Sequence, residues 1–134
     1  MSLIVDASVA VKWFVAEEGS GRARVLLSNQ DDLVAPDLIA LEVGNAMWKK
    51  FRRGLMTEVQ VAAASRRLPS LFSRLASLLE LAPRACALAT TLDHPIYDCL
   101  YLALAEREQL AIVTADDRML ALAERFGAME VRPL

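Results

Sequence analysis

Short apolar runs alternate with longer segments of helical periodicity along almost the whole chain. Apolar runs bounded by turn residues predict strands at 3–5, 33–35 and 110–114, and Val131 marks a last short strand. Apolar positions three and four residues apart predict helices at 8–14, 22–28, 37–53, 95–108 and 116–125, with a further helix opening at Thr57. Gly54 closes the helix at 37–53, so we expect this helix and the next to form a hairpin.

Strands that alternate with helices require crossover connections, and these favour a parallel sheet. We therefore predict a three-layer α/β/α domain with a mainly parallel central sheet of four to five strands, spanning residues 1–134 as a single domain. The leucine-rich segment 71–81 lies between Pro69 and Pro83. Its pattern fits a helix that runs into a short strand but does not fix it.

Composition sets limits on the class of protein. Hydrophobic residues make up 55% of the 134, enough for a core, and the net charge of −2 excludes a globally basic nucleic-acid binder. Cys86 and Cys99 lie in apolar helical stretches, so we expect both to be reduced core residues. No apolar stretch is long enough to span a membrane, which predicts a soluble, cytoplasmic protein.

Four carboxylates sit where apolar sequence stops or is interrupted: Asp6, Glu42, Asp98 and Asp116. Asp6 and Asp116 follow predicted strands directly, and ligands bind parallel sheets at the carboxyl ends of the strands. Asp98 lies within an apolar helix, where an unpaired buried carboxylate would be costly. We therefore predict that the four acids gather around a cation.

Each acid also has an ordinary structural interpretation. Asp6 and Asp116 are suitable helix N-caps, and Asp117 is a favourable first-turn acid. His94, the only histidine, precedes Pro95 in a turn, and we assign it no chemistry.

The helix at 37–53 carries a polar stripe, because residues three and four apart share a helix face: Glu42, Asn45, Lys49 and Arg53. If its N-terminal end faces the sheet, Glu42 joins Asp6, and Asn45 can fix the orientation of Glu42. Lys49 and Arg53 would then extend outward as phosphate contacts of RNA. An ordinary solvated face with a Glu–Lys contact remains open as the alternative.

Oxygen ligands without clustered Cys or His select a hard ion, Mg²⁺ or Mn²⁺, over Zn²⁺. A divalent ion would also relieve the repulsion among the four carboxylates. Such ions accept phosphate oxygens and activate water, which points to hydrolysis of phosphodiester bonds.

The order of four short motifs, VDASV, LEVGN, YDCLYLALA and TADD, resembles that of the PIN-domain nucleases over essentially the whole chain. It is closest to the compact VapC-type toxins of prokaryotic toxin–antitoxin pairs. The resemblance implies a metal-dependent endoribonuclease in which Asp6, Glu42, Asp98 and Asp116 form the catalytic acidic quartet. The metal ligands would be Asp6, Asp98 and Asp116, with Asp6 and Asp98 the most direct.

The same resemblance implies that Ser8, Asn45 and Thr114 orient the acids. It also implies an RNA substrate, a homodimer, and a cognate antitoxin whose C-terminal segment fills the groove near the acids. Trp48, Phe51 and the segment 71–81 could supply a dimer or antitoxin surface, or could simply face the core.

The sequence argues against two other functions and leaves a third one open. A phosphorelay receiver domain needs an N-terminal acidic pair and a late lysine, whereas Asp6 stands alone and no lysine follows Lys50. A haloacid-dehalogenase-type phosphatase needs a second aspartate where this chain has Ser8. A catalytically silent PIN-fold binding module stays open, although the four acids are intact.

Overall fold

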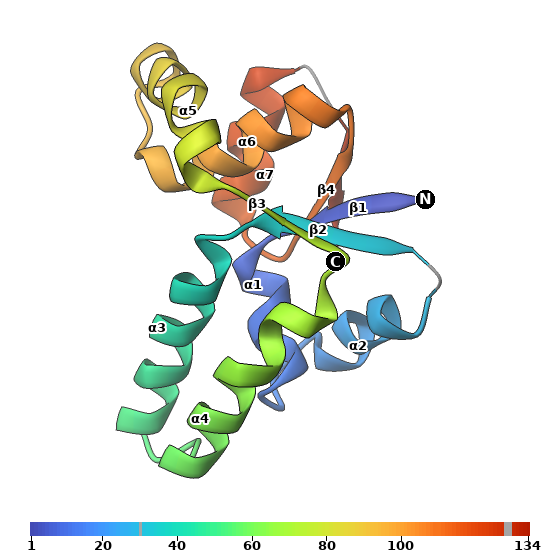
Figure 1. Cartoon of the computed structure of the whole chain (residues 1–134), viewed down its shortest axis with the longest axis vertical. Coiled ribbons are helices and arrows are strands. Elements are labelled where there is room, and N and C mark those ends of the chain that lie inside the picture. The colour runs from blue at the N-terminus through green and yellow to red at the C-terminus, as the bar shows by residue number, and fades with distance from the viewer. Residues whose placement is uncertain (30, 128–129) are drawn as a thin grey trace.

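A five-stranded parallel sheet forms the centre of the protein (Figure 1). The computed structural model describes residues 1–29, 31–127 and 130–134. The strands, in the order β3-β2-β1-β4-β5 across the sheet, are all parallel to their neighbours. Their bounds are β1 Ser2–Val5, β2 Asp32–Pro36, β3 Arg74–Ala76, β4 Ala111–Thr114 and β5 Val131–Pro133.

The three inner strands are almost continuously buried, as expected for a parallel sheet covered on both faces. The first strand of the chain, β1, lies in the middle. It pairs with β2 through Ile4 opposite Val34 and with β4 through Ile4 opposite Ile112. The carboxyl ends of β1 and β4 are therefore neighbours, although the two strands lie far apart in the sequence.

Helices cover both faces of the sheet, with α1 to α4 on one side and α5 to α7 on the other (Figure 1). This arrangement confirms the predicted three-layer α/β/α class with a parallel sheet. The α-helices are α1 Ala7–Ala10, α2 Ser20–Ser28, α3 Ile39–Arg52, α4 Glu58–Arg67, α5 Leu78–Leu92, α6 Ile96–Glu108 and α7 Asp117–Phe126. Two 3₁₀ turns, Val11–Trp13 and Leu68–Leu71, follow α1 and α4. Across the described residues, none of the helices combines the length and apolar character needed to cross a bilayer.

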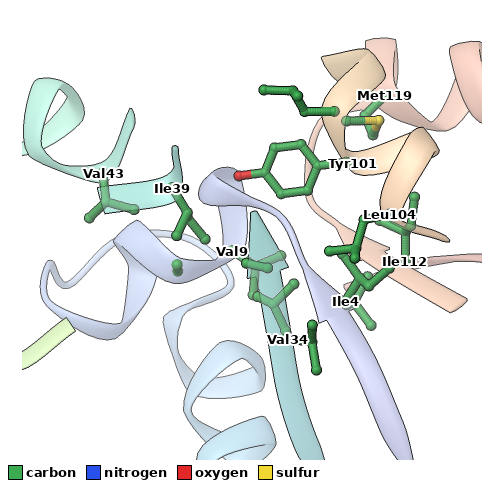
Figure 2. Packing of buried hydrophobic residues seen from close by; sticks show 14 of the residues in the cluster. Ile4, Val9, Val34, Ile39, Val43, Tyr101, Leu104, Ile112 and Met119 are labelled. Carbon is green, nitrogen blue, oxygen red and sulfur yellow. The ribbon is translucent and has the colours of Figure 1, made fainter. Parts of the chain in front are cut away.

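The core is one continuous cluster on both sides of the sheet. Figure 2 shows Ile4, Val34 and Ile112 of the sheet packed between Val9, Ile39 and Val43 on one side and Leu104 and Met119 on the other. The helix α6 runs through this core, since every residue from Cys99 to Ala105 is buried. Cys99 is thus a core residue as predicted. Cys86 is also a free cysteine, but the prediction that it lies in the core was wrong, because it is exposed on α5.

The helices α3 and α4 form the predicted hairpin, and a capping box starts the second helix. The Thr57 hydroxyl accepts the Gln60 N–H at 3.1 Å, and the Gln60 side chain accepts the Thr57 N–H at 2.8 Å. The hairpin extends away from the sheet (Figure 1), and Trp48 and Phe51 remain 48% and 44% exposed. The alternative in which these two side chains face the core is therefore wrong.

The leucine-rich segment begins at the end of the 3₁₀ turn Leu68–Leu71, contains β3 and ends in the start of α5, so the short strand that its pattern allowed is present but precedes the long helix. The prediction also missed α5, because Pro83 lies inside it rather than at its end. Proline removes one hydrogen bond of the helix. Here Leu81, Ala85 and Leu88 are buried on one side of α5, which packs against α6, and this packing outweighs the local preference.

Candidate functional site

Four carboxylates from distant parts of the chain line one cavity of about 310 Å³. Asp6 caps α1 directly after β1, and Asp116 caps α7 just beyond β4, so neighbouring strand ends bring them together. Glu42 and Asp98 come from the first turns of α3 and α6. The other lining residues are Ala7, Ser8, Asn45, Ala46 and Arg118. The structure therefore brings together all four acids that the sequence analysis selected, at the predicted edge of the sheet.

Asp6 is the most enclosed of the four, with only 6% of its surface exposed. Its Oδ1 accepts the N–H of Ser8 at 2.6 Å, which is the N-cap interaction, and its Oδ2 accepts the hydroxyl of Thr114. The two interpretations of Asp6 are thus compatible, because the carboxylate that caps the helix also lines the cavity. Burial raises the pKa of Asp6 although both hydrogen bonds oppose it, and the nearby charge of Asp98 adds to the increase.

Thr114 and Ser8 connect the strand ends below the cavity. The fully buried Thr114 hydroxyl donates to Asp6 and accepts the N–H of Asp116 at 3.0 Å. The Ser8 hydroxyl lies 3.3 Å from that of Thr114 and accepts the N–H of Ala115 at 3.0 Å. These contacts hold Asp6 and the loop that carries Asp116 in a fixed relation. Such a geometry suits the orienting function that the resemblance implied for Ser8 and Thr114.

Glu42 reaches the cavity from α3 and is hydrogen-bonded to a tyrosine that the sequence analysis missed. The Tyr101 hydroxyl, buried within α6, donates to Glu42 Oε1 at 2.7 Å. Burial raises the pKa of Glu42 to about 7, the hydrogen bond from Tyr101 opposes this, and the charges of Asp6 and Asp98 add to it. Asn45 lines the same cavity but makes no side-chain hydrogen bond to an acid within the described residues.

Asp98 has a second missed neighbour, His94, whose Nε2 lies 2.7 Å from Asp98 Oδ2. His94 precedes α6 and Asp98 lies four residues later, a spacing that brings side chains together at the start of a helix. That spacing was readable in the sequence. Assigning His94 no chemistry therefore overlooked a contact with one of the four acids.

The cavity is electrostatically strained by its own carboxylates. Asp6 and Glu42 each experience the charge of Asp98 as well as their own burial, and neither forms an ion pair with a described cation. The only cation lining the cavity among the described residues is Arg118, 3.6 Å from Asp116 and largely exposed. Within the described ranges, no three His, Cys, Asp or Glu side chains stand close enough together to form a closed metal-binding group. Among the described residues the carboxylates line one cavity, but they lie further apart than the ligands of a bound metal ion would.

The basic end of the predicted stripe lies further along α3. Lys49 and Arg53 line a separate hollow of about 380 Å³ together with Trp48 and Arg52. The guanidinium of Arg52 lies 5.2 Å from the centre of the Trp48 ring. Lys49 is about 10 Å along the helix axis from Glu42, because the two residues are seven positions apart at about 1.5 Å per residue. The structure therefore places Lys49 and Arg53 outside the acidic cavity, on the same helix as Glu42.

Similar sequences among known proteins identify the family of this chain. The PIN domain family matches residues 3–125. The chain is 37% identical over 131 residues to Ribonuclease VapC3 of Pyrobaculum aerophilum, covering 96% of this chain and 98% of the relative. It is 34% identical to Exonuclease VapC9 of the same organism over 110 residues, 81% of this chain and 78% of the relative.

A solved structure shares the fold. The crystal structure of Mycobacterium tuberculosis VapC20, titled a sarcin-ricin loop cleaving toxin, superposes with a TM-score of 0.72 at 20% identity. The match covers 98% of this chain and 99% of that one.

Proposed function

The chain belongs to the VapC group of the PIN domain family, and from that premise we propose that it is a metal-dependent endoribonuclease, the toxin of a toxin–antitoxin pair. The observation that carries the proposal is the convergence of Asp6, Glu42, Asp98 and Asp116 on one cavity. The relative named Ribonuclease VapC3 supports the choice of RNA as substrate.

The donor set of the cavity fits Mg²⁺ or Mn²⁺. All four acids offer oxygen, the donor that these ions prefer. The raised pKa values of Asp6 and Glu42 reflect burial and mutual repulsion, which a divalent cation would relieve. In this proposal Asp6, Asp98 and Asp116 hold the ion. Once bound, the ion would activate a water molecule and stabilise the leaving 3′ oxygen of the RNA.

The chain's own residues orient these groups. Ser8 and Thr114 fix the two oxygens of Asp6 in the hydrogen bonds described above. Glu42 Oε1 is bound to Tyr101, which leaves Oε2 to hold or release a proton. Because Glu42 is not one of the three proposed ligands of the ion and keeps one carboxylate oxygen without a hydrogen-bond partner among the described residues, we propose it as the proton-handling member of the four.

Lys49 and Arg53 are proposed to bind phosphate groups of the RNA beyond the cleavage site. Both side chains are exposed and line the hollow near the end of α3. Grouped cations are typical of surfaces that bind the phosphate backbone of a nucleic acid. Basic residues also favour the C-terminal end of a helix for electrostatic reasons alone, so this assignment needs its own test.

The decisive experiment uses RNA without ends. A circular RNA that is opened by the protein in Mg²⁺ or Mn²⁺, but not in EDTA, demonstrates metal-dependent endonuclease activity. A 5′-labelled linear RNA of the same sequence identifies the ends, for which we expect 5′ phosphate and 3′ hydroxyl. Cleavage of the linear RNA alone would indicate an exonuclease, and equal cleavage in EDTA would exclude the metal mechanism.

Two variants control this experiment. Asp98→Asn should abolish cleavage because it removes a cavity carboxylate. Asp117→Asn is the matched control, since this acid is exposed in the first turn of α7 and lies outside the cavity lining. A binding module without catalysis is the second candidate. It predicts that circular RNA is bound but never opened in any metal.

We also propose a homodimer and a cognate antitoxin, as the VapC resemblance implies. The α3–α4 hairpin exposes four large apolar side chains, Trp48, Phe51, Leu55 and Val59. Grouped apolar side chains on a protein surface often mark a site of protein–protein contact. We assign this hairpin surface to the second copy of the chain, and the groove at the acids to the C-terminal segment of the antitoxin.

A further inference from the structure

Tyr101 is an unusual choice for the position it occupies. Its side chain is 1% exposed and is among the largest fully buried side chains of the protein. Every residue of α6 from Cys99 to Ala105 is buried, and Tyr101 carries the only hydroxyl group among them. A phenylalanine would fill the same space without any polar atom, whereas a buried hydroxyl without a partner loses the hydrogen bonds that water would give it. The hydroxyl therefore requires a partner.

That partner is Glu42, 59 positions away in the sequence. Figure 2 shows the Tyr101 ring among core residues, with its hydroxyl pointing toward the side where Ile39 and Val43 of α3 lie. The hydroxyl donates to Glu42 Oε1 at 2.7 Å. The hydrogen bond from Tyr101 thus connects α6, on one side of the sheet, to Glu42 of α3, on the other side.

The other three acids of the cavity have their own supports. The Ser8 N–H and the Thr114 hydroxyl hold Asp6, the Arg118 N–H holds Asp116, and His94 contacts Asp98. The Glu42 side chain has Tyr101 as its one hydrogen-bond partner within the described part of the chain. Glutamate has a longer side chain than aspartate, so it loses more conformational freedom when it is fixed.

We infer that Tyr101 is a positioning residue, whose buried hydroxyl holds the Glu42 carboxylate in the acidic cavity and thereby supports the reaction without touching RNA or metal. This inference rests on the proposed function of the cavity. It extends that function to a residue of the core. Its consequence is that removing a single oxygen atom from the interior should impair the site while leaving the packing intact.

The test compares two identical substitutions on one helix. Tyr101→Phe removes the hydroxyl that binds Glu42, and Tyr97→Phe removes a hydroxyl that is 60% exposed one turn earlier. Glu42 is not one of the three proposed ligands, but its charge lies in the same cavity and attracts the ion, and removing the hydrogen-bond partner of such a group typically lowers metal affinity or activity by about 10–100-fold. We expect a loss of at least about tenfold in RNA cleavage rate and weaker Mn²⁺ binding, followed by electron paramagnetic resonance, for Tyr101→Phe alone.

A double-mutant cycle separates positioning from general stability. In a Glu42→Ala background, Tyr101→Phe should cause little further loss, because the side chain that the hydroxyl positions is gone. Glu42→Asp is a second route to the same answer, since the shortened side chain keeps the charge but retracts from Tyr101. It should reproduce the loss even if Tyr101→Phe does not fold.

Three outcomes decide between the possibilities. Unchanged cleavage and Mn²⁺ binding in Tyr101→Phe, or additive losses in the double mutant, would overturn the positioning role. A wild-type chain that binds Mn²⁺ but opens no RNA would reject the proposed function, while weakened Mn²⁺ binding in Tyr101→Phe alone would still support the inference. A wild-type chain that binds no Mn²⁺ would overturn both.

Discussion

Glu42→Gln should make the metal-free protein more stable at alkaline pH, although it removes a charged residue from the proposed active site. In the folded protein the pKa of Glu42 is raised from 4.5 to about 7, first by burial and then by Asp6 and Asp98. Between these two values the folded state holds a proton that the unfolded chain has released. The free energy of unfolding therefore falls as the pH rises from about 4.5 to 7, and the loss is complete above 7.

The size of the effect follows from the same interval. One pKa unit corresponds to about 1.36 kcal/mol, so the interval from 4.5 to about 7 sets an upper limit of roughly 3 kcal/mol. Partial exposure of Glu42 and relaxation of the cavity reduce this value, and we expect about 1–3 kcal/mol at pH 8. Glutamine is neutral at every pH and keeps an oxygen that accepts the Tyr101 hydroxyl at the position of Glu42 Oε1.

Urea unfolding in EDTA at pH 4, 6 and 8 measures this effect. The stability of the variant should equal that of the parent chain at pH 4 and exceed it at pH 8, and excess Mn²⁺ should stabilise the parent chain more than the variant. Glu124→Gln, which changes an exposed carboxylate on α7, is the matched control and should leave the pH dependence unaltered. If Glu42→Gln and the parent chain lose the same stability between pH 4 and 8, the electrostatic account of the cavity is wrong.

Three further predictions test other parts of the structure. Asp6→Asn should abolish RNA cleavage while the fold is retained, so a large fall in thermal stability would instead assign Asp6 to structure. Changing both Lys49 and Arg53 to Ala should weaken RNA binding evenly across sequences. It should also reduce the slope of the logarithm of the RNA-binding constant against the logarithm of the salt concentration by about 1.4 for single-stranded RNA. An unaltered slope would show that the two residues form an ordinary solvated helix face and do not contact phosphate. In sedimentation at micromolar concentration the chain should run as a dimer and Trp48→Asp should shift it toward monomer, whereas a strictly monomeric parent chain would remove the dimer proposal.

The parts of the fold that follow from local pattern could be predicted from the sequence. Three of the predicted strands lie within two residues of their observed bounds, because short apolar runs between turn residues are unambiguous in a parallel sheet. The carboxylates Asp6 and Asp116 could be expected to meet, since each follows a strand and parallel strands end at the same edge. Their place in one cavity with Glu42 and Asp98 agrees with that expectation.

The remaining features depend on contacts that the local pattern does not contain. Pro83 ordinarily ends a helix, yet packing of α5 against α6 overrides this preference. Tyr101 reads as one more apolar position of its helix, and its partner is remote in the sequence. The pattern leaves open whether Trp48 and Phe51 face the core or a partner, and their exposure on the hairpin excludes the core. His94 differs from these residues, because its four-residue spacing to Asp98 is visible in the sequence itself.

The central position of β1 affects when the cavity can form during synthesis. Translation makes this strand first, but one of its two neighbours, β4, is made last but one, and the contact between Asp6 and Thr114 spans 108 residues. A polypeptide released from a ribosome that stalls before β4 therefore lacks this neighbour of β1. It also lacks the Thr114 hydroxyl, which donates a hydrogen bond to Asp6. Translation products that end before Asp116 cannot assemble the four acids, so whatever chemistry these acids perform begins only after that residue has been added.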